Sequence, residues 1–195
     1  MSEIRDKIEG KLDPAKFQSP MPFLIRLKNL IFGKERPDVY TRVTFYVSFV
    51  ITIIFLLWNL LGYVSIASAD YIQEVKGISV DKILEGRGME LGFFPTTFAG
   101  KLMTVYGLGA ICWAIVIVGL VLLWRKNKKF LLFTLIPIGF FVGMEIFYLN
   151  FQYFVEDTTL FDKMALLILA GLCIVHAFMM KNEREGGSIS FFGED

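Results

Sequence analysis

The chain has 195 residues, 55% of them hydrophobic, and a mean hydropathy of +0.57. Its 20 Lys and Arg against 19 Asp and Glu leave a formal net charge of +1, which gives no basis for binding nucleic acid. A composition this apolar argues against a water-soluble domain and predicts an integral membrane protein whose first partner is the lipid bilayer.

Residues 1–42 precede the first long apolar segment and carry nine of the basic residues. Within them, apolar residues recur at helical spacing from Phe23 to Ile31, with Arg26 and Lys28 between them. A basic amphipathic helix beside a first span is typical of segments that lie in the membrane interface. Docking onto the cytoplasmic face of a partner is the alternative.

Four segments follow that are apolar and long enough to cross a hydrocarbon core of about 30 Å. Because lipid offers no hydrogen-bond partners, each should be a helix. The predicted fold is an all-α membrane protein with a four-helix transmembrane domain at residues 43–180. The expected spans are residues 43–66, 102–124, 130–155 and 160–180.

The segments between the spans differ in charge. Residues 125–129 hold four basic residues, whereas residues 67–101 hold four basic residues among five acidic ones. The positive-inside rule therefore places both termini, including the tail at residues 181–195, in the cytoplasm. The predicted topology is N-in and C-in, with residues 67–101 as an extracytoplasmic loop.

The extracytoplasmic loop is expected to form a contact surface, since it is too short for an independent domain. A short helix is predicted in it, capped by Ser79 and ended by Gly86, and the glycine-rich residues that follow are expected to form turns. Pro95 should start the second spanning helix before the lipid begins.

Glu145 is an ionisable residue inside the third expected span. At 100° per residue, Tyr148 and Gln152 lie on its face of the helix, and Asn59 and Tyr63 share a face of the first span at a matching depth. An intramembrane ionisable residue indicates function, because its burial costs several kcal/mol unless the residue is paired or neutralised. We predict a polar intramembrane cluster of these residues, in which a neutral Glu145 bonds the Asn59 amide.

Gly139 and Gly143 lie on a different face of the third span. Small residues at this spacing let two helices approach closely. Two distinct packing faces on one helix favour a larger assembly, in which both sides of this helix contact protein.

His176 is the single histidine and lies near the cytoplasmic end of the fourth span. One histidine excludes bis-histidine haem ligation and histidine-rich metal sites within this chain. A haem or quinone contact shared with another subunit remains as an alternative. No hydrolase or nucleotide-binding motif is present, so we predict no catalytic residue, no metal and no cofactor.

The favoured functional expectation is a non-catalytic, integral inner-membrane subunit of a larger complex, with an accessory, scaffold or assembly role in an energy-transducing system. Its partners would be other membrane protein subunits. The alternative is a small proton- or ion-coupled transporter component that uses Glu145. The lack of an Arg- and Ser-rich, acid-poor presequence favours a bacterial over a mitochondrial inner membrane.

Overall fold

The computed structural model describes residues 29, 31–33 and 37–184. The chain divides into two units, residues 1–36 and residues 37–195. Almost all of the predicted interfacial helix, and the tail beyond residue 184, lie outside the described residues.

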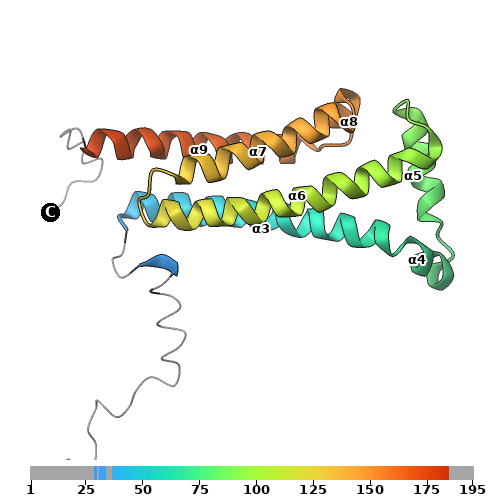
Figure 1. The fold of residues 1–195 in the computed structure, drawn as a ribbon, viewed down its shortest axis with the longest axis horizontal. Helices are drawn as coiled ribbons and strands as arrows, with labels where there is room; N and C mark the ends of the chain where they lie inside the picture. Colours follow the sequence, from blue (N-terminus) through green and yellow to red (C-terminus); the bar gives the residue numbers. More distant parts are fainter. Residues whose placement is uncertain (1–28, 30, 34–36, 185–195) are drawn as a thin grey trace, which may run out of the picture. The chain divides into compact units, whose positions relative to one another are not determined.

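Seven α-helices make up the described part of the second unit (Figure 1). They are α3 (Val39–Ala67), α4 (Ala69–Lys76), α5 (Val80–Glu90), α6 (Pro95–Trp124), α7 (Phe130–Phe147), α8 (Phe151–Glu156) and α9 (Leu160–Arg184). Helices α3, α6, α7 and the Leu160–Met180 part of α9 are long and apolar enough to cross a membrane. The predicted all-α fold with four apolar helices is confirmed, and it indicates a multi-pass membrane protein.

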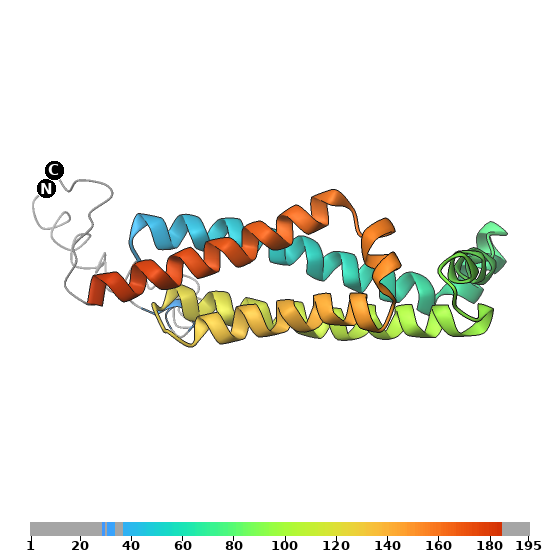
Figure 2. The ribbon, with the colours of Figure 1, turned by 90° about the horizontal axis from the view of Figure 1, so that it is seen from above.

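The four long helices form an antiparallel bundle in which sequence neighbours are also spatial neighbours. Helix α6 packs against α3 and α7, and α9 closes the ring by contacting α7 and α3. Helix α3 begins and α9 ends at one end of the bundle, beside the α6–α7 turn, which we call the turn end (Figures 1 and 2). Helices α4, α5 and α8 lie toward the opposite end, the loop end, where α5 runs across the bundle and packs on α6.

The buried face of α3 carries mostly small polar residues together with Phe45 and Phe55, whereas its outer face is apolar. The buried polar residues are Thr41, Thr44, Ser48, Thr52 and Asn59. Small polar residues allow close helix packing. Two of these groups bond to their own helix: Thr52 Oγ1 donates to Ser48 O at 2.7 Å, and Asn59 Nδ2 donates to Phe55 O at 2.8 Å.

Two glycines of α6 let its neighbours approach. A Cβ at Gly119 would lie 2.7 Å from Thr134 Cγ2 and 2.9 Å from the carbonyl carbon of Phe133, so a side chain there would push α7 away. A Cβ at Gly109 would collide with Asn59 Oδ1 of α3 and would lie 2.8 Å from Phe141 Cε2 of α7.

The turn end is filled by aromatic side chains. His176 stacks on Tyr40 at 5.4 Å between ring centroids and meets the Phe130 ring edge-on at 5.7 Å. Phe45 meets Trp124 edge-on at 4.8 Å, which joins α3 to the end of α6. Aromatic pairs at these separations add to the stabilisation from burial alone.

Asp38 fixes the start of α3 at the turn end. Its carboxylate accepts from Thr41 N at 3.0 Å, as an N-cap does, and pairs with Lys126 Nζ of the α6–α7 turn at 2.9 Å. Partial burial acts to raise the pKa of Asp38, but the bonds from Lys126 and Thr41 outweigh it and hold that pKa well below its usual value.

The third spanning segment differs from the continuous helix expected over residues 130–155. Helix α7 ends at Phe147, and the chain turns at Asn150, whose φ of 81° interrupts helical geometry, before α8 begins at Phe151. Asn150 Nδ2 donates to Leu91 O at 3.5 Å, so the turn leans on the segment after α5. In the segment between α3 and α6, helix α5 starts after Ser79 but continues past Gly86 to Glu90.

Candidate functional site

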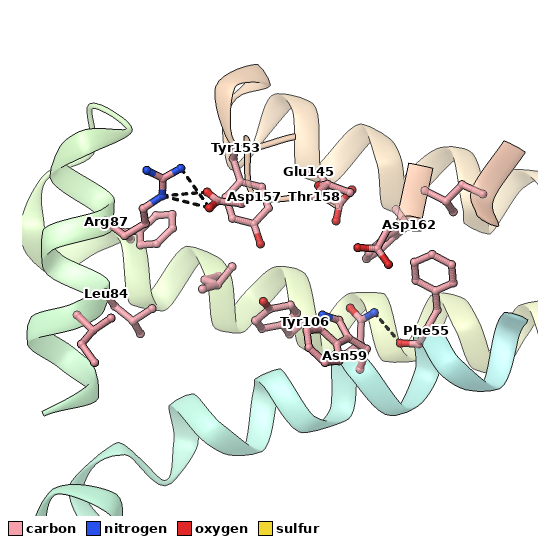
Figure 3. A pocket seen from close by; sticks show the side chains of 16 residues that line it. Phe55, Asn59, Leu84, Arg87, Tyr106, Glu145, Tyr153, Asp157, Thr158 and Asp162 are labelled. Carbon is pink, nitrogen blue, oxygen red and sulfur yellow. Dashed lines mark hydrogen bonds and ion pairs between the residues drawn. The ribbon is translucent and has the colours of Figure 1, made fainter. Parts of the chain in front are cut away.

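A partly open cavity of about 310 Å³ lies in the half of the bundle nearest the loop end (Figure 3). Helices α3, α5, α6, α7, α8 and α9 all contribute to its lining. Its polar lining includes Asn59, Arg87, Tyr106, Glu145, Tyr153 and Asp162. Glu145, Tyr153 and Asp162 face Asn59 and Tyr106 across this space.

Glu145 is the carboxylate that lies deepest in the bundle. It follows Phe141 by one helical turn, which places both on the buried face of α7. Its side chain is 8% exposed, and among the described residues its Oε2 has no hydrogen-bond partner. A buried carboxylate without a partner has a high free energy and favours any cation that can reach it.

Asn59 lines the same cavity from α3 but does not bond Glu145 as predicted. Its Nδ2 donates to Phe55 O on its own helix, while its Oδ1 rests against Gly109 and finds no hydrogen-bond partner in the part of the chain that the structure describes. The side chain is 1% exposed. The cavity is therefore lined by two residues on opposite helices, each of which has a buried acceptor atom without a partner in the described structure.

The other members of the predicted polar cluster lie outside the cavity lining. Tyr63 is exposed, and its ring packs on Gly107 of α6. A Cβ at Gly107 would lie 3.4 Å from Tyr63 Cδ2. The Tyr148 ring lies 5.2 Å from Lys101 Nζ, and Gln152 Nε2 donates to Glu156 Oε1 at 2.9 Å on α8. Tyr148 and Gln152 do not share the face of Glu145 because α7 ends at Phe147, and helical spacing no longer applies beyond that residue.

Arg87 joins α5 to the end of α8 at the rim of the cavity. Its Nε donates to the Asp157 carboxylate at 3.1 and 3.2 Å, and its two other nitrogens donate to Glu90 at 2.6 Å and Glu156 at 2.8 Å. These hydrogen bonds raise the pKa of Arg87, and bonds from Gln152 and then Arg87 lower the pKa of Glu156. The ion pairs hold α5 over the loop end.

The role of Arg87 gave no signal in the sequence. Its acceptors Glu156 and Asp157 lie 69 and 70 residues further along the chain, and the residues around Arg87 were expected to form turns. The sequence also did not mark Asp162 as a cavity residue. Its carboxylate forms a capping box at the start of α9, where it accepts from Thr159 N at 3.2 Å.

Two tyrosines narrow the cavity between α6 and α8. Figure 3 shows the Tyr153 and Tyr106 side chains directed toward one another. Burial first, and then Tyr106, raise the pKa of Tyr153 far above its usual value. Tyr153 therefore remains a neutral hydroxyl over the physiological pH range.

An aromatic floor closes the cavity toward the turn end. The Phe55 ring stacks on Trp113 at 4.6 Å, and Trp113 meets Phe141 edge-on at 5.5 Å. Phe55 and Phe141 line the cavity, and Trp113, which is 1% exposed, fills the space beneath them. These three rings from α3, α6 and α7 separate the cavity from the packed half of the bundle.

The remaining predicted residues lie away from the cavity. A Cβ at Gly139 or Gly143 would meet nothing within 4 Å, so that face of α7 packs against no described part of this chain. His176 is buried in the aromatic cluster of the turn end. Within the described residues, no group of three or more His, Cys, Asp or Glu is placed to hold a metal ion.

Comparison with protein-family models, curated proteins and solved structures gives no match to this chain. The residues of the cavity are therefore the basis on which a function is assigned.

Proposed function

We propose that this protein binds a cation inside its transmembrane bundle through Glu145, as a component of a membrane transport system. One observation carries the proposal: Glu145 lines an open cavity, yet one of its buried oxygens has no hydrogen-bond partner among the described residues. An ionised carboxylate that is buried without a partner costs several kcal/mol, and a bound cation would remove that cost.

The proposed topology gives the site a direction. With both termini in the cytoplasm, the loop end and its cavity would face the outside of the cell. The floor of Phe55, Trp113 and Phe141 is closed, so a cation would enter and leave from the loop end. Movement across the membrane would then require a partner subunit or an opening of this floor.

Carbodiimide labelling in native membranes tests the proposal directly. These reagents attack carboxyl groups in apolar surroundings, and the product at Glu145 is detected by mass spectrometry of the digested protein. We expect at least one of Na⁺, K⁺ or a tertiary ammonium ion, each titrated over its concentration range, to protect Glu145 saturably. Exposed Glu74 is the internal control, and a Glu145 that reacts like Glu74 and that no cation protects would contradict the proposal.

Two substitutions separate a cation ligand from a structural group. Glu145→Gln keeps the shape of the side chain and a hydrogen-bonding group but removes the charge, so it should abolish the rise in Tm that a bound cation causes and leave the Tm without added cation unchanged. Glu145→Leu should preserve folding only if the site has no structural need for a polar group. Unchanged cation binding in the Gln variant would refute the role of Glu145.

A second candidate function is a non-catalytic subunit of a larger membrane assembly. The specific observation in its favour is the open Gly139–Gly143 face of α7, which has the spacing of close helix contacts but no contact within the described chain. Purification in mild detergent followed by mass spectrometry would reveal stoichiometric partners. Gly139→Leu with Gly143→Leu should release them, whereas Gly171→Leu, at an equally open site on α9, should not.

A further inference from the structure

The volume of the cavity is larger than an inorganic cation needs. A water molecule occupies about 30 Å³ of liquid, and pockets for organic ligands begin at roughly 300 Å³. At about 310 Å³, the cavity matches a small organic molecule. A bare ion at Glu145 would leave most of this space to water or empty.

The charges of the lining select the sign of the ligand. Glu145, Asp157 and Asp162 contribute carboxylates, and the Arg87 guanidinium among them is already bonded to Asp157. Three lining residues have a buried polar atom without a partner in the described structure: Glu145 Oε2 and Asn59 Oδ1 can only accept hydrogen bonds, and the Thr158 hydroxyl can donate or accept one. An ammonium group offers donors and a positive charge, whereas a carboxylate or phosphate would meet like charge and unsatisfied acceptors.

The remaining walls suit an apolar body attached to such a group. Aromatic rings line the cavity on four helices, at Phe55, Trp58, Phe98, Tyr106, Phe141 and Tyr153. The faces of these rings attract cations, and their edges and the leucines beside them bury hydrocarbon. The same chemistry occurs at the rim, where Lys101 Nζ lies 4.6 Å from the centre of the Phe93 ring.

We propose that the cavity binds a small organic ammonium ion, with the ammonium group between Glu145 and Asn59 and the apolar body against the aromatic walls. This inference rests on the proposed function, because it assumes that Glu145 binds a cation, and it adds the chemical class of that cation. Among the lining carboxylates, Asp157 is paired with Arg87 and Asp162 accepts from Thr159 N and Oγ1, whereas Glu145 has a buried oxygen without a partner in the described structure.

Thermal unfolding of the full-length protein in detergent, with four probes of matched or contrasting chemistry, tests the ligand class. The probes are phenethylammonium, its neutral analogue 2-phenylethanol, its anionic analogue 3-phenylpropanoate, and NaCl or KCl. Phenethylammonium should raise the Tm saturably, because a ligand that binds only the folded state stabilises it. The neutral and anionic analogues should not, and Glu145→Gln should weaken the ammonium effect roughly tenfold or more.

A matched control and a second measurement keep the outcome clear. Glu74→Gln removes an exposed carboxylate that does not line the cavity and should bind phenethylammonium as the unmodified chain does. If Glu145→Gln does not fold, protection of Glu145 from carbodiimide in the unmodified protein by N,N-dimethylphenethylammonium, which cannot form an amide with the activated carboxyl, gives the same information.

Three results would overturn the inference in different ways. Equal binding of phenethylammonium and 2-phenylethanol would indicate an apolar pocket without charge selection. A saturable effect of Na⁺ or K⁺ that Glu145→Gln abolishes, without one for phenethylammonium, would reject the organic ligand and leave the proposed function standing. No effect of any cation, with Glu145→Gln indistinguishable from the unmodified chain, would reject both.

Discussion

The two halves of this bundle are built from the same four helices and differ in almost everything else. At the turn end, Phe130 and His176 are buried in contact with one another, and Asp38 has its bonds satisfied by Thr41 and Lys126. At the loop end, Glu145 and Asn59 line a cavity with acceptor atoms that no described residue satisfies. Under the proposed function, one end of the four helices would supply stability and the opposite end would supply binding.

The largest expected effect comes from removing a ring at the packed end. Phe130→Ala should lower the free energy of unfolding by about 3–5 kcal/mol, because the side chain is fully enclosed and leaves a void. Leu84→Ala at the cavity rim should cost about 1 kcal/mol or less, because Leu84 is only partly buried. Denaturant unfolding in detergent measures both, and equal losses would remove the proposed division between the two ends.

A pair of glycine substitutions tests the same division along α6 and α7. Gly119→Ala should destabilise the bundle by about 1–3 kcal/mol, because the new methyl group would lie 2.7 Å from Thr134 and close to the backbone of Phe133. Gly139→Ala enters open space and should be neutral, or stabilising by up to about 1 kcal/mol through helix propensity. A large loss of stability at Gly139 in the isolated protein would show a contact that this fold lacks.

Asp38 provides a smaller and pH-dependent effect. Asp38→Ala should cost about 0.5–2 kcal/mol through loss of the N-cap. Asp38→Asn keeps one capping oxygen and loses the charge and the second oxygen, which accepts from Thr41 Oγ1 and pairs with Lys126. Because folding lowers the pKa of Asp38, its contribution is complete above the usual value of 3.8 and is lost as the pH falls toward the lower folded value. The Tm difference between the unmodified chain and Asp38→Asn should therefore shrink on acidification; a gap that widens would mean the sign is wrong.

The smallest effect on stability is expected at Arg87. Its ion pairs are exposed, so Arg87→Gln should scarcely change the Tm. It should nevertheless loosen α5 over the cavity and increase the rate at which carbodiimide reaches Glu145. Lys82→Gln, on the same helix but outside the cavity lining, is the control, and equal labelling rates in both variants would argue against a closing role for Arg87.

The long helices and the burial of Glu145 within the bundle followed from the sequence, but the shape of the cavity did not. Apolar length predicts spans because lipid forces the backbone into helices, and an ionisable residue within a span stands out against that background. The turn at Asn150 was not predicted, because a residue other than glycine that adopts a positive φ has no strong sequence signal. The positions of Tyr148 and Gln152 were therefore predicted wrongly. Helical spacing had been extended across a point where the helix ends.

The pairing of Asn59 with Glu145 was a reasonable prediction from matching depth, but depth does not fix how an amide is used. In the fold, the amide nitrogen of Asn59 is taken up by Phe55 O of its own helix, and its side chain is pressed against Gly109. Arg87, Tyr106 and Asp162 reach the cavity only through the tertiary arrangement. To predict these three residues as cavity residues, one must know which helices pack against one another.

The hydrogen bonds inside α3 have a consequence for how the protein is made. Because Thr52 donates to Ser48 O and Asn59 to Phe55 O, this helix can satisfy these polar donors before any neighbour is present. A segment of this kind can leave the insertion machinery and enter lipid alone, and the bundle can assemble afterwards by close packing at Gly109 and Gly119. The order of synthesis would then impose no need for α3 to wait for the rest of the chain.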